Sequence, residues 1–383
     1  MLNGDAYVTH QIPPSRFYSL DVLRGIAALS VVFWHWQHFF IPFNIYGALF
    51  SADKEPLFKV FFVFYKHGNL SVQLFFCLSG FIFFWLYSKP VNEGTVTVGS
   101  FSVLRLSRLY PLHFATLIFT TICQLTYISI TGVFFAYSSN NIYHFLLNLF
   151  FASSWGFQGG LSFNAPAWSV SIEVMLYTIF FVFCRIFRPD MRTLLFTIVT
   201  IIAAQFSISV FGTDIGTGMG YFFLGGLTFT VYERIIKTGD SWRVSIWLPL
   251  ATCIGWLVIV VAMIPANGFT LSKFPWNIQK MICDWTSFIL FSITIMSLAL
   301  IETKRGTLGK RLSSLGDISY SLYLLHFPLQ LALVTVATKL AIDQALFYSP
   351  WFMALFFSFL ISLSFASHRY FEVPMQRFLR RQP

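Results

Sequence analysis

The sequence predicts an all-α fold, a polytopic transmembrane helix bundle of about ten spans with one re-entrant or interfacial segment. Of its 383 residues, 56% are hydrophobic and 10% are charged, whereas soluble domains carry about 25% charged residues. Phenylalanine alone contributes 48 residues, which suits a lipid-facing surface. The apolar runs at 20–41, 191–210 and 280–301 each reach the roughly 20 residues that a helix needs to cross hydrocarbon.

The other apolar runs complete the predicted set of spans. A shorter stretch, 142–158, ends beside several glycines. If this stretch crossed the membrane, the basic clusters after it would lie outside and violate the positive-inside rule. We therefore predict that it is re-entrant or interfacial, on the outer side. The remaining candidate spans lie at 66–87, 109–131, 167–187, 217–236, 244–264, 316–340 and 350–370.

This arrangement places both termini and every arginine of the chain on the cytoplasmic side. The predicted organisation is an N-terminal tail at 1–19, one transmembrane domain at 20–374 and a C-terminal tail at 375–383. The net charge of +10 then reflects membrane topology, because the basic residues lie between apolar runs rather than in one patch, and we expect no nucleic-acid partner. The five cysteines lack metal-binding spacing, so no metal site is predicted.

Ionisable residues inside predicted spans are the first functional candidates, because each costs roughly 2.5–3.5 kcal/mol to insert at a helix centre. Arg24 and His35 belong to the first span, and their spacing puts them on one helix face about 16 Å apart along the axis. The arginine then lies near the cytoplasmic surface and the imidazole near the middle of the bilayer. A lone buried histidine is more often a core residue, but the arginine on the same face favours a functional role.

Two further segments place polar side chains in or beside a span. Arg105 and Arg108 lie one turn apart where the third span opens. They either anchor the topology or clamp a phosphate, since guanidinium groups bind phosphate oxygens bidentately. Glu173 lies about two turns into another span, with Ser169 one turn earlier on the same face. A carboxylate there is neutral, paired or facing a wet cavity, either as a structural pair or as a partner of His35.

These residues fall in segments that resemble, in order, the motifs of membrane acyltransferase family 3, the bacterial group that includes O-antigen and Nod-factor acetylases. The resemblance runs from Leu20 to about Pro374, and its specificity comes from the ordered spacing of several motifs that are each weak alone. The matching segments are LDVLRGIAALSVVFWH with Arg24 and His35, FFCLSGF at 75–81, RLSRLYP with Arg105 and Arg108, WSVSIE with Trp168, Ser169, Ser171 and Glu173, SYSLYLLH with Ser319, Tyr323 and His326, and HRYFEVP near the end.

The resemblance implies transfer of an acyl group, usually acetyl, from a cytoplasmic acyl-CoA to a hydroxyl group of a sugar or glycolipid. Acyl-CoA is then a donor substrate, and no permanently bound cofactor is implied. The implied location is a bacterial inner (plasma) membrane, with the lipid bilayer and a carbohydrate or glycolipid acceptor as partners. Because the chain stops soon after its last motif, we expect it either to finish the transfer itself or to hand the acyl group to a separate extracytoplasmic acyltransferase.

Within this resemblance, His35 and Glu173 are the predicted catalytic residues. His35 acts either as general base on the acceptor hydroxyl or as a covalent relay that is itself acylated. Glu173 is expected to orient the His35 ring or to stabilise its imidazolium, and Tyr323 or Ser171 is expected to offer a hydrogen bond to the oxyanion. The predicted substrate-binding residues are Arg24, Arg105, Arg108, Trp168, Ser169, Ser171, Tyr323 and His326.

The alternative function is a transporter or flippase of lipid-linked sugars, which also places histidine, glutamate and arginine inside a helix bundle. Broken half-helices or rings of charge along a pore favour that reading, and an internal repeat is typical of many transporters. No internal repeat is evident in this sequence. A sensor or scaffold does not need Arg24, His35 and Glu173 together, so the enzyme is the favoured interpretation.

Overall fold

The computed structural model describes residues 13–40, 50–207, 213–238, 241–263 and 276–381. Within these ranges the regular structure is helical and contains no strand, so the predicted all-α class is confirmed. Six stretches of helix are long and apolar enough to cross a membrane, and two shorter apolar helices lie in α7 and α9. The chain is therefore a helical protein of membrane-spanning composition.

The helices follow one another with short connections. The first is α1 (Tyr18–Trp34), which continues directly into a 3-10 helix (His35–Phe39). The others are α2 (Phe58–His67), α3 (Ser71–Asn92), α4 (Val98–Thr131), α5 (Ile142–Leu149), α6 (Trp168–Ile186), α7 (Met191–Ser207), α8 (Thr213–Thr238), α9 (Ser241–Met263), α10 (Trp276–Arg305), α11 (Ser314–Asp317), α12 (Ser319–Lys339), α13 (Pro350–Ser367) and, after a π-helical turn (His368–Glu372), α14 (Val373–Arg380).

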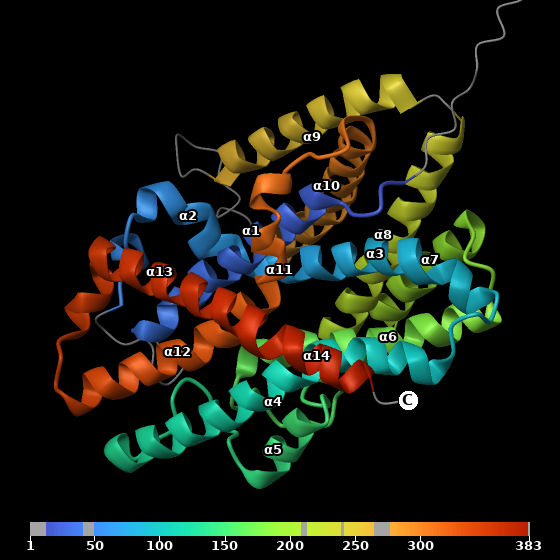
Figure 1. Cartoon of the computed structure of the whole chain (residues 1–383). Helices are drawn as coiled ribbons and strands as arrows, with labels where there is room; N and C mark the ends of the chain where they lie inside the picture. Colours follow the sequence, from blue (N-terminus) through green and yellow to red (C-terminus); the bar gives the residue numbers. More distant parts are fainter. Residues whose placement is uncertain (1–12, 41–49, 208–212, 239–240, 264–275, 382–383) are drawn as a thin grey trace, which may run out of the picture.

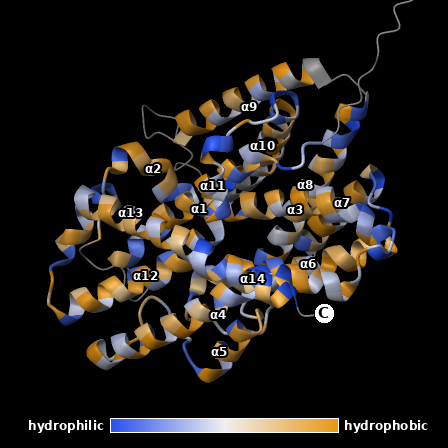
Figure 2. Ribbon diagram, viewed as in Figure 1, coloured by the Kyte–Doolittle hydropathy of each residue, from blue (hydrophilic) through white to orange (hydrophobic). Residues whose placement is uncertain are grey.

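Helix α1 lies in the middle of the bundle and contacts α2, α3, α10, α11 and α12 (Figure 1). The outer helices carry exposed apolar residues, such as Ile122 and Leu125 on α4 and Trp351 and Leu355 on α13. Figure 2 shows hydrophobic colours along the outer helices α4 and α9. Such extended apolar surface is unfavourable in water and suits contact with lipid.

The first predicted span, 20–41, differs from the structure at its outer end. Helix α1 ends at Trp34, and His35 opens the 3-10 helix; residue 41 lies outside the described residues. The predicted single helix is therefore wrong beyond residue 34. A 3-10 turn holds its side chains at a different rotation from an α-helix, so His35 does not simply continue the Arg24 face.

The stretch 142–158, predicted to be re-entrant or interfacial, contains a short helix rather than a span. Helix α5 covers Ile142–Leu149, and the chain then turns back toward α6. The indole of Trp155 donates to the carbonyl oxygen of Ser171, and the backbone N–H of Ser154 donates to the Ser171 hydroxyl. These bonds hold the returning loop against α6.

Helices α3 and α8 cross closely because glycines face the opposite backbone. A Cβ atom added at Gly80 would lie 1.9 Å from the carbonyl oxygen of Phe222, and one added at Gly225 would lie 2.0 Å from that of Cys77. Both distances are far below van der Waals contact, so only glycine fits at these positions. Small residues at helix crossings let the backbones approach and are typical of membrane bundles. The crossing fixes α3 in place.

The N-terminus of α1 is capped by a carboxylate from a distant helix. Glu302 of α10 is fully buried and accepts hydrogen bonds from the backbone N–H groups of Tyr18 (2.8 Å) and Ser19 (2.9 Å). It also accepts one from the Ser19 hydroxyl (2.6 Å). The first N–H groups of a helix have no partner within the helix, and negative charge there interacts favourably with the helix dipole. Glu302 therefore fixes the position of α1.

Replacing Glu302 with alanine is expected to lower the free energy of unfolding by about 1–3 kcal/mol, because buried donors lose their acceptor. Glu302→Gln keeps one acceptor oxygen and should have a smaller effect. Thermal unfolding of the purified protein in detergent measures the effect. Glu233→Ala is the matched control, because the Glu233–Lys237 ion pair is well exposed and such pairs contribute little. Equal midpoints for wild type and Glu302→Ala would contradict the capping role.

Candidate active site

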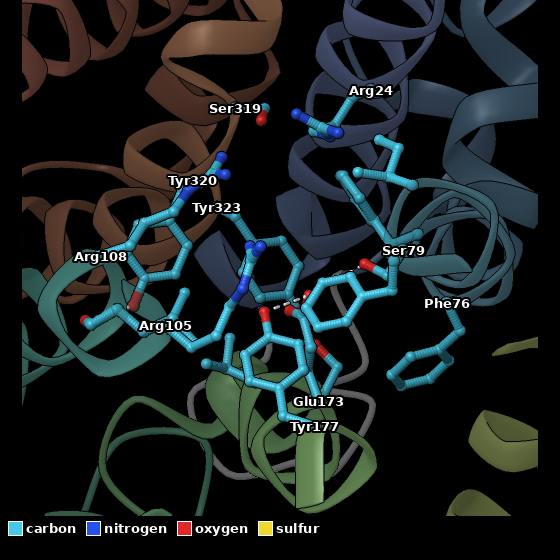
Figure 3. Close-up of a pocket in the computed structure, with 16 residues that line it drawn as sticks. Arg24, Phe76, Ser79, Arg105, Arg108, Glu173, Tyr177, Ser319, Tyr320 and Tyr323 are labelled. Atoms are coloured by element: carbon cyan, nitrogen blue, oxygen red, sulfur yellow. Dashed lines mark hydrogen bonds between the residues drawn. The ribbon is translucent and has the colours of Figure 1, made fainter. Parts of the chain in front are cut away.

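Three arginines line one cavity of about 90 Å³ between α1, α3, α4, α6 and α12. Arg24 comes from α1, while Arg105 and Arg108 come from one turn of α4. Figure 3 shows their side chains approaching a common space, with Glu173 and Tyr177 of α6 on its other side. We call this space the arginine cavity; its other lining residues include Phe75, Phe76, Ser79, Phe83, Ser169, Ser319, Tyr320 and Tyr323.

Arg105 is held mainly by aromatic rings. Its guanidinium carbon lies 4.3 Å from the ring centre of Phe83 and 4.4 Å from that of Tyr87. Its Nε atom is buried and has no hydrogen-bond partner in the described part of the chain. Stacking on ring faces leaves the N–H donors in the guanidinium plane. A buried cation with unused donors is costly unless an anion completes it, so this side chain is suited to an anionic ligand.

A larger hollow of about 470 Å³ adjoins the arginine cavity. The two spaces share Arg24, Arg105 and Arg108, and the hollow is lined in addition by Arg16 near the start of the chain and Arg380 near its end. We call it the terminal hollow. The arginines give both spaces a positive lining, which attracts anions from solution.

Glu173 faces the arginine cavity. Its carboxylate accepts hydrogen bonds from the hydroxyl groups of Ser79 (2.9 Å) and Tyr177 (2.8 Å), drawn as dashed lines in Figure 3. It also attracts the guanidinium groups of Arg24 and Arg105 electrostatically. The expectation that Glu173 orients the ring of His35 is not what the structure shows, because this carboxylate has other partners. Helical periodicity identifies a face of α6 but not the neighbour that the face meets.

His35 belongs to a cluster of three histidines. Its Nδ1 lies 3.0 Å from the carbonyl oxygen of Val31 and 3.2 Å from Nε2 of His326. The ring of His38 stacks on it, with ring centres 5.2 Å apart and planes 16° apart. A carbonyl oxygen only accepts, so neutral His35 carries its proton on Nδ1, and Nε2 keeps a free lone pair. The ring is thereby arranged to accept a proton at Nε2.

His35 lines a second cavity, of about 230 Å³, which we call the histidine cavity. Its wall is polar and aromatic, whereas a lipid-facing wall would be aliphatic. Amide, carboxylate and hydroxyl groups can hydrogen-bond a polyhydroxyl ligand, and aromatic side chains supply flat apolar contact area. The polar and tryptophan residues of the wall are Trp34, Asn69, Gln73, Trp168, Asp214 and Thr217.

Most of this polar wall was not predicted from the sequence. Asn69 and Gln73 lie four residues apart where α3 begins, a spacing that places both on one helix face and that could have identified them. Asp214 lies just before the run 217–236 that was predicted as a span. Its helix, α8, begins at Thr213, so the carboxylate lies at the helix start rather than in a loop.

The hydroxyl groups expected to face an oxyanion are already used. The hydroxyl oxygens of Tyr323 and Ser169 lie 2.7 Å apart, and Tyr323 donates to the carbonyl oxygen of Pro166. The Ser171 hydroxyl donates to the carbonyl oxygen of Phe151. Tyr323 therefore remains a lining residue with a fixed ring, while Ser171 holds the loop after α5 against α6 and lines neither cavity.

Most of the predicted site residues thus gather at two neighbouring cavities. His326 is fully buried behind His35. The others divide as follows: Arg24, Arg105, Arg108, Ser169 and Glu173 line the arginine cavity, His35 and Trp168 line the histidine cavity, and Tyr323 lines both.

Comparison with known families identifies the class of this site. Residues 17–367 match the sequence profile of the acyltransferase-3 family, described as an acyltransferase domain. The chain belongs to the acyltransferase-3 family. The match includes every residue that lines the arginine and histidine cavities. The protein is accordingly an acyltransferase that moves groups other than amino-acyl groups, and the transporter alternative loses its support.

Individual proteins are also similar to this chain. "Acyltransferase MdmB" of Streptomyces mycarofaciens is 27% identical over 353 residues, covering 82% of this chain and 80% of that protein. "Putative acetyltransferase ORF330" of Acidianus two-tailed virus is 22% identical over 334 residues, covering 84% and 86%. "Protein 2 in picA locus" of Rhizobium radiobacter is 39% identical over 103 residues, covering 27% of this chain and only 43% of that protein. No solved structure is significantly similar to the chain.

Proposed function

We propose that this protein is an integral membrane O-acyltransferase that moves an acyl group, in the first instance acetyl, from acyl-CoA to a hydroxyl group of a cell-surface or exported carbohydrate. The observation that carries the proposal is the juxtaposition of the arginine cavity and the histidine cavity, which share Phe76 and Tyr323. The first is suited to a phosphorylated donor and the second to a polyhydroxyl acceptor. Family membership supports the reaction class.

The donor enters through the terminal hollow. Phosphate groups of CoA bind guanidinium groups through charge-assisted, bidentate hydrogen bonds, and Arg24, Arg105 and Arg108 line the route. The unused Nε of Arg105 is one donor that such a phosphate satisfies. The uncharged pantetheine arm continues into the narrower arginine cavity and brings the thioester to Tyr323. Glu173 keeps the guanidinium groups from repelling one another before the donor arrives.

The acceptor lies in the histidine cavity. Its hydroxyl group gives its proton to Nε2 of His35 while its oxygen attacks the thioester carbonyl carbon, as in general base catalysis. The carbon–sulfur bond of the intermediate then breaks, and the imidazolium returns the proton to the departing CoA thiolate. Val31 and His326 hold the ring throughout by their contacts with Nδ1. The products are an ester and free CoA, so no other reactant is required.

We also propose about ten spans with both termini cytoplasmic, in an inner (plasma) membrane. The ammonium group of Lys310 lies 5.8 Å from the ring centre of Tyr18, and Arg16 and Arg380 line one hollow. Three basic segments that are distant in sequence therefore lie on one side of the molecule. Such clustering is typical of the cytoplasmic side, and the terminal hollow then opens where acyl-CoA is present.

Single introduced cysteines test this orientation. In a background without the five native cysteines, a cysteine placed within 304–311 is expected to react with an impermeant thiol reagent only after permeabilisation. A cysteine placed within 265–277, a segment that lies mostly outside the described residues, is expected to react in intact cells. The expectation follows from the charge distribution. The reverse labelling pattern would overturn the topology.

The reaction itself is tested with membranes from cells that contain or lack the gene. Incubated with isotope-labelled acetyl-CoA, membranes containing the protein are expected to incorporate label into alkali-labile esters of their carbohydrate fraction. Membranes without the protein are expected to show only background. Equal incorporation in both preparations would exclude the proposed activity.

A further inference from the structure

The arginine and histidine cavities meet at two side chains. Among the described residues, Phe76 of α3 and Tyr323 of α12 are the two that line both cavities. Figure 3 shows Phe76 at the edge of the arginine cavity, away from Arg24 and Arg108. An acyl group that passes from a donor in the first cavity to an acceptor in the second therefore passes these two rings.

Tyr323 forms the fixed side of this passage. Its hydroxyl oxygen lies 2.7 Å from that of Ser169 and donates to the carbonyl oxygen of Pro166. Its ring is buried, and Phe75 contacts it edge-on at a centroid distance of 6.0 Å. Moving this ring breaks buried hydrogen bonds, which is costly.

Phe76 forms the apolar side and is held by packing alone. Its ring meets Trp168 edge-on, with centroids 6.5 Å apart. A Cβ atom added at Gly218 would lie 3.5 Å from Cε2 and Cζ of Phe76, which is ordinary van der Waals contact. The ring is thus backed by α8 and has neighbours on its outer edge. The free width between the cavities is consequently set by the size of the residue at position 76.

We propose that Phe76 limits the length of the acyl group that the enzyme transfers, and this inference rests on the proposed function. The carbonyl carbon of the thioester must lie where the acceptor oxygen can reach it, beside Tyr323, so the acyl tail points at the Phe76 ring. The methyl group of acetyl fits against that ring, whereas each added methylene collides with it. Overfilling a packed apolar site forces side chains out of their preferred rotamers. Phe76 is therefore a specificity-determining residue.

A competition assay measures this selectivity. Membranes containing the enzyme receive an equimolar mixture of acetyl-, propionyl- and butyryl-CoA, and the esters formed on carbohydrate are quantified by mass spectrometry. One methylene is discriminated by roughly 10- to 200-fold in apolar pockets, so the wild type is expected to prefer acetyl over propionyl within that range. Phe76→Ala is expected to reduce the preference at least about tenfold. Phe76→Leu makes a smaller cavity and should shift the ratio in the same direction if the alanine variant does not accumulate.

Phe84→Ala is the matched control, because Phe84 lies on the same helix, is equally buried and lines neither cavity. It should keep the wild-type ratio of acetyl to propionyl ester. A wild-type ratio in both Phe76 variants, with acetyl transfer still measurable, would overturn the role of Phe76 alone. If the wild type transfers none of the three acyl groups, the proposed function fails, and the inference fails with it.

Discussion

His35→Ala is expected to reduce acyl transfer by about 10²- to 10⁴-fold, the contribution of a positioned general base. The reason is geometric: Nδ1 of His35 is occupied by Val31 and His326, so the opposite nitrogen is the basic atom and the ring lines the histidine cavity. The measurement is the rate of ester formation from labelled acetyl-CoA, at matched protein abundance in the membrane.

His144→Gln is the control for loss of a histidine as such. His144 lies on α5, where its ring contacts Asn141 and accepts a hydrogen bond from the N–H of Gly159, and it lines neither cavity. Near-normal transfer by His144→Gln together with the loss in His35→Ala supports the base assignment. Wild-type transfer by His35→Ala at equal abundance would refute it. A labelled acyl group isolated on wild-type His35 itself would replace direct attack with the covalent relay.

Replacing Arg105 and Arg108 with glutamine is expected to weaken acetyl-CoA binding by roughly 10- to 150-fold for each guanidinium–phosphate hydrogen bond that the substitution removes. This range corresponds to about 1.5–3 kcal/mol for a hydrogen bond to a charged group. Both side chains line the arginine cavity and the terminal hollow. Binding of acetyl-CoA to the purified protein, by calorimetry in detergent, gives the dissociation constants.

Acetyl-pantetheine, which has neither the nucleotide nor its phosphates, separates binding of a phosphate from a general effect on the fold. The wild type and the Arg105→Gln and Arg108→Gln variants should bind it equally weakly. Arg188→Gln is the control for removal of positive charge, because Arg188 is exposed and lines neither the cavity nor the hollow. Unchanged acetyl-CoA affinity in both variants would return Arg105 and Arg108 to a role in membrane topology.

The sequence pattern predicted the helical membrane fold because composition and run length alone determine it. Helix ends were harder, since they depend on local hydrogen bonds. The capping box of Thr97 and Ser100 starts α4 well before the predicted boundary at 109, whereas Gly132, in the left-handed conformation, ends it at the predicted position. The cap of α1 by Glu302 joins residues nearly the whole chain apart, and no local pattern indicates such a contact.

The residues of the candidate site were predictable to a similar extent, but their partners were not. Charged residues in apolar runs pointed to Arg24, His35 and Glu173, because burying a charge demands a reason. Which residues meet depends on how each helix is rotated in the bundle. The structure accordingly pairs Glu173 with Ser79 and Tyr177, while His35 meets His326 from a helix near the other end of the chain.

The most direct test of a donor cavity joined to an acceptor cavity through His35 uses sealed inside-out membrane vesicles. Isotope-labelled acetyl-CoA is added outside, on the side of the terminal hollow, and alkali-labile ester is measured on carbohydrate inside the vesicles. The account predicts rapid labelling of the enclosed carbohydrate by the wild type and background labelling by His35→Ala. Labelling that proceeds equally in the two, or that requires acetyl-CoA inside the vesicles, would contradict it.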